Sequence, residues 1–261
     1  MNPFAHFLLT CFNAAPKGQP AVPAGADATG LERRFGLFER VCLPFVDRQA
    51  EGAFQWLVFM DWGTPVPFKE RMAALAVHYD FLRPVYCSKF DAETVLAEIR
   101  RREGPGSIRI TTRLEAASAL HPRFTKLVQE TAEARLGNMD LAKGFAIRFS
   151  LGCCERNGDF YLLRDAGACA SFVSAPDCAQ TVLDVDSGTG VGGAPEVVKR
   201  LRPMWCRVMQ ADAAGEPPRG VYWPGGGTSE FAAIVGEVAL RGALWRVSET
   251  LRTAARCLFR R

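Results

Sequence analysis

The strongest constraint on the fold is a regular alternation of short apolar runs and amphipathic segments through the first two-thirds of the chain. Short apolar runs are typical of buried strands, and apolar residues that repeat every three or four positions are typical of helices. Alternating strands and helices favour an α/β fold with a mostly parallel sheet flanked by helices. We expect strands at 7–12, 54–60, 81–86 and 108–112, and helices at 31–45, 69–77, 92–102 and 122–135.

The last third of the chain has a different pattern. A β-hairpin is expected from strands at 145–151 and 160–164, around Arg156-Asn157-Gly158-Asp159. Glycine-rich loops are expected at 187–193 and 225–227. This part therefore does not continue the alternation of strands and helices.

The C-terminal residues form a helical segment of their own. Residues 229–258 are predicted to form one long helix or a helix pair, with Gly236 and Gly242 as candidate breaks. We therefore divide the chain into a main domain over 1–227 and a basic amphipathic C-terminal helix over 228–261.

Charge is concentrated at the C-terminal end of the 261-residue chain. The net charge is +4, but residues 241–261 hold six Arg and one acid, Glu249, and carry +5, so the other 240 residues sum to about −1. A near-neutral body does not favour a nucleic-acid partner. The apolar residues among these Arg suit a helix lying on an anionic membrane surface, and the alternative is a helix packed on its own domain with a solvated Arg face.

Cysteine and histidine usage favours a cytoplasmic protein with reduced thiols. The nine Cys form no C-x-x-C pair, and the three His are scattered, so no zinc site is expected. The segment Met1–Phe4 lacks the basic start of a secretory signal, and no apolar run approaches the roughly 20 residues that span a bilayer. We expect a cytoplasmic location. The basic helix suggests that the protein could also contact the inner face of the membrane peripherally.

Several common catalytic motifs are missing from the sequence. It has no G-x-G-x-x-G after the first strand, no P-loop, no G-x-S-x-G and no H-E-x-x-H, which disfavours classical dinucleotide, Walker-type, triad and zincin chemistry. Ligands of parallel sheets bind at the carboxyl ends of the strands. This rule places Asn13, Asp61 and residues 113–118 near a common cleft.

A series of segments, each weak alone, occurs in the order found in one known family. They are 6–13, 31–39 with 42–44, 56–61 with 64–65, 110–114, and 205–210 with 219–220. Together they resemble the rhamnosyltransferase family, a GT-A-like group of bacterial glycosyltransferases, over about residues 5–225. The resemblance implies a GT-A-type α/β fold in which residues 1–227 bind a nucleotide sugar and an acceptor. The reaction implied is transfer of a sugar, with rhamnose as the named candidate, to a hydroxyl of a surface polysaccharide or glycolipid.

The resemblance also implies a divalent metal, Mn²⁺ or Mg²⁺, held by an acidic cluster after Thr-Arg-Leu and by a late His. Here the cluster reads Glu115-Ala116-Ala117-Ser118, and the late His is Gln210. Glu115 and Gln210 are thus the remaining metal-ligand candidates, where a hard cation would neutralise the diphosphate leaving group. The departure leaves three alternatives open: a metal-dependent transferase, a metal-independent one in which basic residues replace the ion, and a catalytically inactive binding or regulatory protein.

The resemblance assigns further roles to single residues. Asp177 is the candidate base for the acceptor hydroxyl, with Asp184 and Asp186 behind it. Arg113 is expected to contact the diphosphate. Further substrate-binding candidates are Thr10, Asn13, Asp61, Glu115 and Trp205. Structural alternatives remain open: Asp61 and Asp177 occur where turns favour Asp, Arg113 could pair with a neighbouring acid, Glu115 could cap the next helix, and Trp205 could belong to the core.

Overall fold

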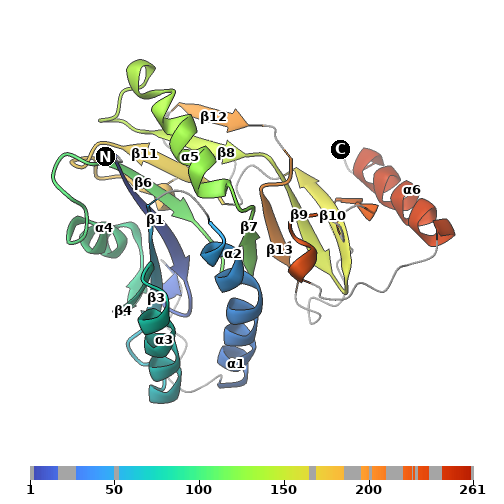
Figure 1. Cartoon of the computed structure of the whole chain (residues 1–261), viewed down its shortest axis with the longest axis horizontal. Helices are drawn as coiled ribbons and strands as arrows, with labels where there is room; N and C mark the ends of the chain where they lie inside the picture. The colour runs from blue at the N-terminus through green and yellow to red at the C-terminus, as the bar shows by residue number, and fades with distance from the viewer. Residues whose placement is uncertain are drawn as a thin grey trace.

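A computed structural model describes residues 3–16, 28–49, 53–164, 169–184, 195–199, 202–209, 220–224, 226, 229–234 and 243–259. It contains a seven-stranded sheet, a five-stranded sheet and a small pair of two-residue strands. Figure 1 shows the larger sheet with its helices on one side of the molecule, and the smaller sheet and the last helix on the other. Within the described residues, no helix is long and apolar enough to cross a membrane.

The larger sheet has the order β12-β8-β11-β6-β1-β3-β4. Strand β11 runs antiparallel to both of its neighbours, and every other neighbouring pair is parallel. This mostly parallel sheet confirms the predicted fold class and the four predicted strands. The strands are β1 (Phe4–Cys11), β3 (Gln55–Asp61), β4 (Leu82–Cys87), β6 (Ile108–Arg113), β8 (Phe145–Phe149), β11 (Ser171–Ser174) and β12 (Glu196–Lys199).

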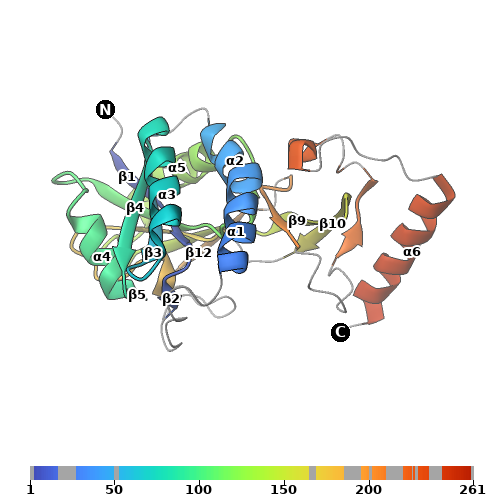
Figure 2. The same ribbon diagram turned by 90° about the horizontal axis from the view of Figure 1, so that it is seen from below.

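Helices cover both faces of this sheet, as Figure 2 shows. One face is covered by α1, α2, α3 and α5, whose apolar side chains join Phe4 and Leu8 of β1 in one core cluster. The other face is covered by α4 and by a segment that contains Cys178 and Val182, which pack on Phe7 and Leu9. The helices are α1 (Ala28–Leu37), α2 (Leu43–Asp47), α3 (Val66–His78), α4 (Ala92–Arg100) and α5 (Phe124–Glu133), with a π-helical turn at Phe38–Cys42 between α1 and α2.

The smaller sheet has the order β14-β10-β9-β13-β7. The predicted hairpin is right in its turn and wrong in its first strand. Residues 145–149 belong to the larger sheet as β8, the chain changes sheet at Ser150, and β9 pairs with β10 instead. Asn157 and Gly158 have φ of 53° and 85°, which suits a two-residue hairpin turn. The strands are β7 (Ser118–Leu120), β9 (Leu151–Arg156), β10 (Asp159–Arg164), β13 (Trp205–Val208) and β14 (Val221–Tyr222).

The C-terminal part contains a shorter helix than predicted. Helix α6 covers Ala243–Phe259 and packs against β14. Residues 229–234 instead form a turn with one 3-10 segment, Ala232–Ile234, whose Ile234 and preceding Phe231 are buried among apolar side chains of the smaller sheet. The prediction that a helix begins at residue 229 is therefore wrong. The two candidate breaks, Gly236 and Gly242, lie outside the described residues. The proposed division at 227/228 stays a prediction.

Candidate active site

The larger sheet reverses its direction of growth beside β1. From β1 the chain adds β3 and β4 on one side, and then returns to place β6 on the other side. In open α/β sheets such a switch point leaves a crevice outside the carboxyl ends of the strands, where ligands bind. In this chain that crevice lies beyond Cys11 at the end of β1 and Arg113 at the end of β6.

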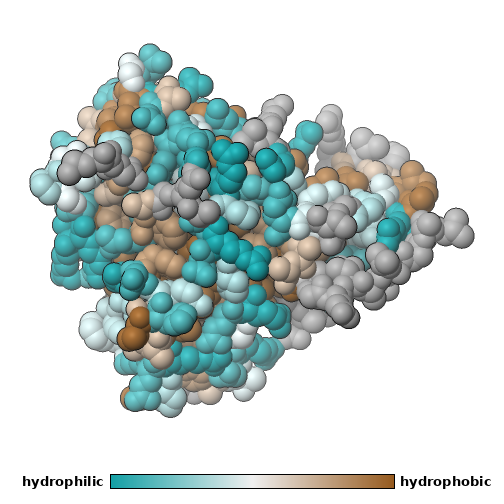
Figure 3. Space-filling view, in the orientation of Figure 1, coloured by the Kyte–Doolittle hydropathy of each residue, from teal (hydrophilic) through white to brown (hydrophobic). Residues whose placement is uncertain are grey.

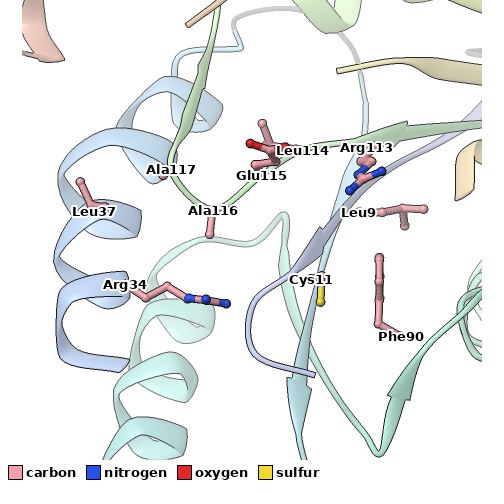
Figure 4. A pocket seen from close by; sticks show the side chains of 10 residues that line it. All are labelled: Leu9, Cys11, Arg34, Leu37, Phe90, Arg113, Leu114, Glu115, Ala116 and Ala117. Atoms are coloured by element: carbon pink, nitrogen blue, oxygen red, sulfur yellow. The ribbon is translucent and has the colours of Figure 1, made fainter. Parts of the chain in front are cut away.

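A pocket lies at this switch point, and Figure 4 shows its lining side chains. Strand β1 contributes two residues, helix α1 two, the small strand β5 (Lys89–Phe90) one, the end of β6 one, and the connection from β6 to β7 four. The lining consists of Leu9, Cys11, Arg34, Leu37, Phe90, Arg113, Leu114, Glu115, Ala116 and Ala117. The pocket therefore includes the loop that the resemblance singled out.

Backbone bonds hold the start of this loop in place. The Leu114 amide donates to the Leu9 carbonyl at 2.9 Å, and the Arg113 amide donates to the Ala170 carbonyl at 3.0 Å. Leu114 is buried at 1% exposure, whereas Arg113 is exposed. The buried leucine anchors the loop and leaves the neighbouring guanidinium free to face the pocket.

Two guanidinium groups give the pocket a positive charge. Arg34 of α1 donates to the Phe12 carbonyl and lies across the pocket from Arg113. Burial raises the pKa of the Cys11 thiol, while the charges of Arg34 and Arg113 act to lower it. Both cations are therefore close enough to influence a group inside the pocket, and an anionic ligand there would meet favourable charge.

The pocket's carboxylate is already paired with a cation. Arg207 of β13 donates from Nη2 to Glu115 Oε1 at 3.0 Å, and its Nε lies 2.9 Å from Glu115 Oε2. This two-point pairing engages both oxygens of Glu115. The negative charge of Glu115 is thus largely cancelled, and the surroundings of the pocket remain positive.

These residues do not fit a divalent metal. In the part of the chain that the structure describes, no three His, Cys, Asp or Glu side chains gather in a way that could hold a metal ion. Both Glu115 oxygens face Arg207, whereas a hard cation needs several oxygen ligands. The second candidate ligand, Gln210, lies outside the described residues.

Asn13 and Asp61 lie at the same edge of the sheet but bond to one another and to Thr64. The Asp61 amide donates to Asn13 Oδ1 at 3.1 Å, and Asn13 Nδ2 donates to Thr64 Oγ1 at 2.9 Å. The Asp61 carboxylate accepts from the Gly63 amide at 2.6 Å. These bonds build a fixed turn next to the pocket, and neither residue lines it.

Thr10 and Trp205 are engaged in the core. The Thr10 hydroxyl donates to the Leu114 carbonyl at 2.8 Å and accepts from Trp56 Nε1 at 2.8 Å. Trp205 is 1% exposed, and its Nε1 donates to the Phe149 carbonyl at 3.0 Å. Thr10 therefore positions the pocket loop, and Trp205 presents no open ring face to a sugar.

The structure does not bring Asp177 and Arg113, the predicted catalytic pair, together. Strand β11 is antiparallel, so Ser174 pairs with Arg109 near the start of β6, and Asp177 lies in the turn beyond it. Arg109 donates to the Pro176 and Cys178 carbonyls on either side of Asp177. Four residues of strand, or about 13 Å, separate Arg109 from Arg113. Asp177 therefore lies near the amino end of β6, whereas the pocket lies at the carboxyl end of that strand.

Sequence reasoning missed Arg34, Phe90 and Arg207 as site residues. Arg34 lies in the segment 31–39 and Arg207 in the segment 205–210 of the resembling series, and neither was predicted to line a site. Arg207 meets Glu115 across 92 positions of sequence, and no local pattern signals such a contact. The one available signal for Arg34 was its place on the first helix after β1.

Comparison with known proteins identifies a family. The family model described as "Putative rhamnosyl transferase" matches residues 20–186. Among curated proteins, no sequence relative matches. One similar solved structure is 4-diphosphocytidyl-2C-methyl-D-erythritol synthase from Anaerococcus prevotii, at 12% identity and a TM-score of 0.33, covering 66% of this chain and 70% of that one. Because the family model spans more than half of the sequence, the chain belongs to this rhamnosyl transferase family.

Proposed function

We propose that this protein is a GT-A-type glycosyltransferase that uses a nucleotide-sugar donor without a metal ion. Rhamnose is the first candidate for the sugar, and the acceptor is a hydroxyl of a surface polysaccharide or glycolipid at the cytoplasmic face of the membrane. The observation that carries the proposal is the positively charged pocket at the switch point of the sheet, in a member of this family.

The two pocket arginines supply the positive charge that a divalent metal would otherwise supply. Bond cleavage between the sugar and the nucleoside diphosphate leaves negative charge on the diphosphate. Arg113 and Arg34 line the pocket from opposite sides, and charge-assisted hydrogen bonds to phosphate oxygens strengthen as that charge develops. This assigns leaving-group stabilisation to residues of the chain itself.

The acceptor hydroxyl also needs a base, and Asp184 replaces Asp177 as the candidate. The segment after Asp177 follows β6 toward the pocket: Cys178 is bonded to Arg109, and the Val182 amide donates to Thr111 Oγ1 at 2.8 Å. Asp184 ends the 3-10 turn Val182–Asp184 that follows and is exposed, with its carboxylate accepting from the Thr181 amide at 2.8 Å. An exposed carboxylate in this segment suits removal of a proton from a hydroxyl.

The second candidate function is a catalytically inactive sugar-nucleotide-binding or regulatory protein. The Glu115–Arg207 pair favours it, because the family's acidic cluster has shrunk to a single carboxylate with its own partner. Both candidates predict binding of the donor, and only the first predicts its cleavage.

Release of nucleoside diphosphate separates the two candidates. The purified chain is incubated with dTDP-, UDP- and GDP-sugars in the presence of EDTA, with and without glycolipid extracts as acceptor. We expect release from at least one donor, and we expect Asp184→Asn to abolish it while donor binding persists. Donor binding without release under any condition would favour the inactive protein.

A further inference from the structure

Helix α6 packs on its sheet with polar residues. Glu249 and Thr253 are 4% and 1% exposed. The Thr253 hydroxyl accepts from the Tyr222 amide of β14 at 2.9 Å, and the Tyr161 hydroxyl of β10 donates to Glu249 Oε1 at 3.5 Å. The face of α6 that meets the protein is therefore held by hydrogen bonds.

The same helix presents apolar residues to solvent. Val247 and Leu251 are 59% and 67% exposed, and residues four apart lie side by side on one helix face. A helix that is packed for its own domain turns its apolar stripe inward and its polar residues outward. Among the α6 side chains that the structure describes, buried Glu249 and Thr253 and exposed Val247 and Leu251 show the reverse arrangement, so packing within the described chain does not account for this exposed apolar pair.

The position of α6 leaves that face open. The helix lies at the outer end of the molecule, beyond the smaller sheet, in both ribbon views (Figures 1 and 2). The space-filling view shows hydrophobic colouring at this end (Figure 3).

The charge around the apolar face indicates what that surface is. Arg252 lies next to Leu251 and is 58% exposed, while its guanidinium bonds Glu249 at 2.7 and 2.8 Å. Residues 241–261 carry a net +5. Two copies of this helix would bring like charges together, whereas an anionic lipid surface offers both apolar depth and opposite charge.

We infer that α6 is a membrane-docking helix that lies in the plane of an anionic bilayer surface with Val247 and Leu251 inserted. The glutamate and threonine on its opposite face fasten it to the smaller sheet, so docking needs no unpacking of the domain. This inference is independent of the transferase proposal, because it depends on no residue of the pocket.

Vesicle flotation of the full chain tests the inference. The probes are phosphatidylcholine vesicles and vesicles in which a third of the lipid is phosphatidylglycerol, at low salt. We compare wild type with Val247→Gln/Leu251→Gln, which removes the apolar face and places a good helix former at both positions. The matched control is Val77→Gln, because Val77 is 85% exposed on α3. Circular dichroism verifies that all three chains are folded.

We expect wild type and Val77→Gln to float with the anionic vesicles and to bind phosphatidylcholine at least about tenfold more weakly. The double variant should partition at least about tenfold more weakly than wild type into anionic vesicles. Equal flotation of wild type and the double variant would overturn the inference, as would absence of wild-type flotation. A wild-type dimer in light scattering that the double variant loses, without lipid binding, would assign the face to a second copy instead.

Discussion

Glu115 and Arg207 meet through two points, with Nη2 3.0 Å from Oε1 and Nε 2.9 Å from Oε2. The pair links the pocket loop that follows β6 to strand β13 of the smaller sheet. Its consequence is chemical as well as structural, because among the described residues it occupies the one carboxylate that lines the pocket. The positive charge of Arg34 and Arg113 is then left for an anionic ligand.

Replacing Arg113 should weaken binding of nucleoside diphosphates. Arg113→Gln removes a charge-assisted contact, so the dissociation constant for the preferred nucleoside diphosphate should rise about tenfold or more. Isothermal titration calorimetry measures the change. Arg135→Gln removes an exposed arginine beyond α5 and should leave the constant unaltered. Equal affinity in Arg113→Gln and wild type would remove Arg113 from the site.

A metal site can be built in this loop only after Arg207 is removed. Ala117 lines the pocket, whereas Ser118 is 3% exposed in β7 and offers no room for a ligand. The double variant Ala117→Asp/Arg207→Gln places a second carboxylate near an unpaired Glu115. It should bind Mn²⁺ at least about tenfold more tightly than wild type.

Electron paramagnetic resonance of free Mn²⁺ reads out this binding directly. Ala117→Asp alone should bind less Mn²⁺ than the double variant, because Arg207 still competes for Glu115. If the single and double variants bind Mn²⁺ equally, Arg207 does not control the charge of this loop.

Trp205 packs on Gly152 so closely that a side chain cannot be added there. A Cβ at Gly152 would lie 2.2 Å from the Trp205 ring, whereas a Cβ at Gly36 in α1 would have no neighbour within 4 Å. Gly152→Ala should therefore destabilise the protein by about 1–3 kcal/mol or more. Gly36→Ala should stabilise it by up to about 1 kcal/mol. Urea unfolding measures both, and a neutral Gly152→Ala would contradict the packing.

His6 should make stability fall in acid. Burial lowers the pKa of His6 from 6.5 to about 3, so below pH 6.5 the unfolded chain takes up a proton that the folded chain does not. The contribution of His6 to the free energy of unfolding is fully present above pH 6.5 and is lost as the pH falls toward 3. Between pH 7 and pH 5 the loss is about 2 kcal/mol.

His6→Gln should flatten this part of the pH profile of the free energy of unfolding. His78→Gln changes an exposed histidine at the end of α3 and should keep the wild-type profile. An unchanged slope in His6→Gln would show that other groups cause the acid sensitivity.

The order of elements in the first two-thirds could be predicted because each buried strand is a separate apolar run. The exchange between sheets at Ser150 could not, since β8 and β9 form nearly one continuous stretch and their partners lie far away in sequence. The distance of Asp177 from the pocket could not be predicted for a related reason. The sequence pattern of a strand does not reveal whether it runs parallel or antiparallel to its neighbours. Because β11 is antiparallel to β6, the turn that follows β11 lies near the amino end of β6.

The pocket loop itself could be located from sequence, because it follows a strand of a parallel sheet. The partner of Glu115 could not be found, because Arg207 reaches it through the pairing of β13 with β7. Similarly, the basic character of α6 is visible in the sequence. The burial of Glu249 and exposure of Leu251 depend on which helix face meets β14.

Titration of the chain with dTDP-, UDP- and GDP-sugars, each with Mn²⁺ and with EDTA, tests the central claim most directly. A pocket in which Arg34 and Arg113 replace the metal should bind a nucleotide sugar with the same affinity, within about twofold, under both conditions. Binding that appears only with Mn²⁺, or strengthens more than about tenfold with it, would contradict the claim and return Glu115 to the role of metal ligand.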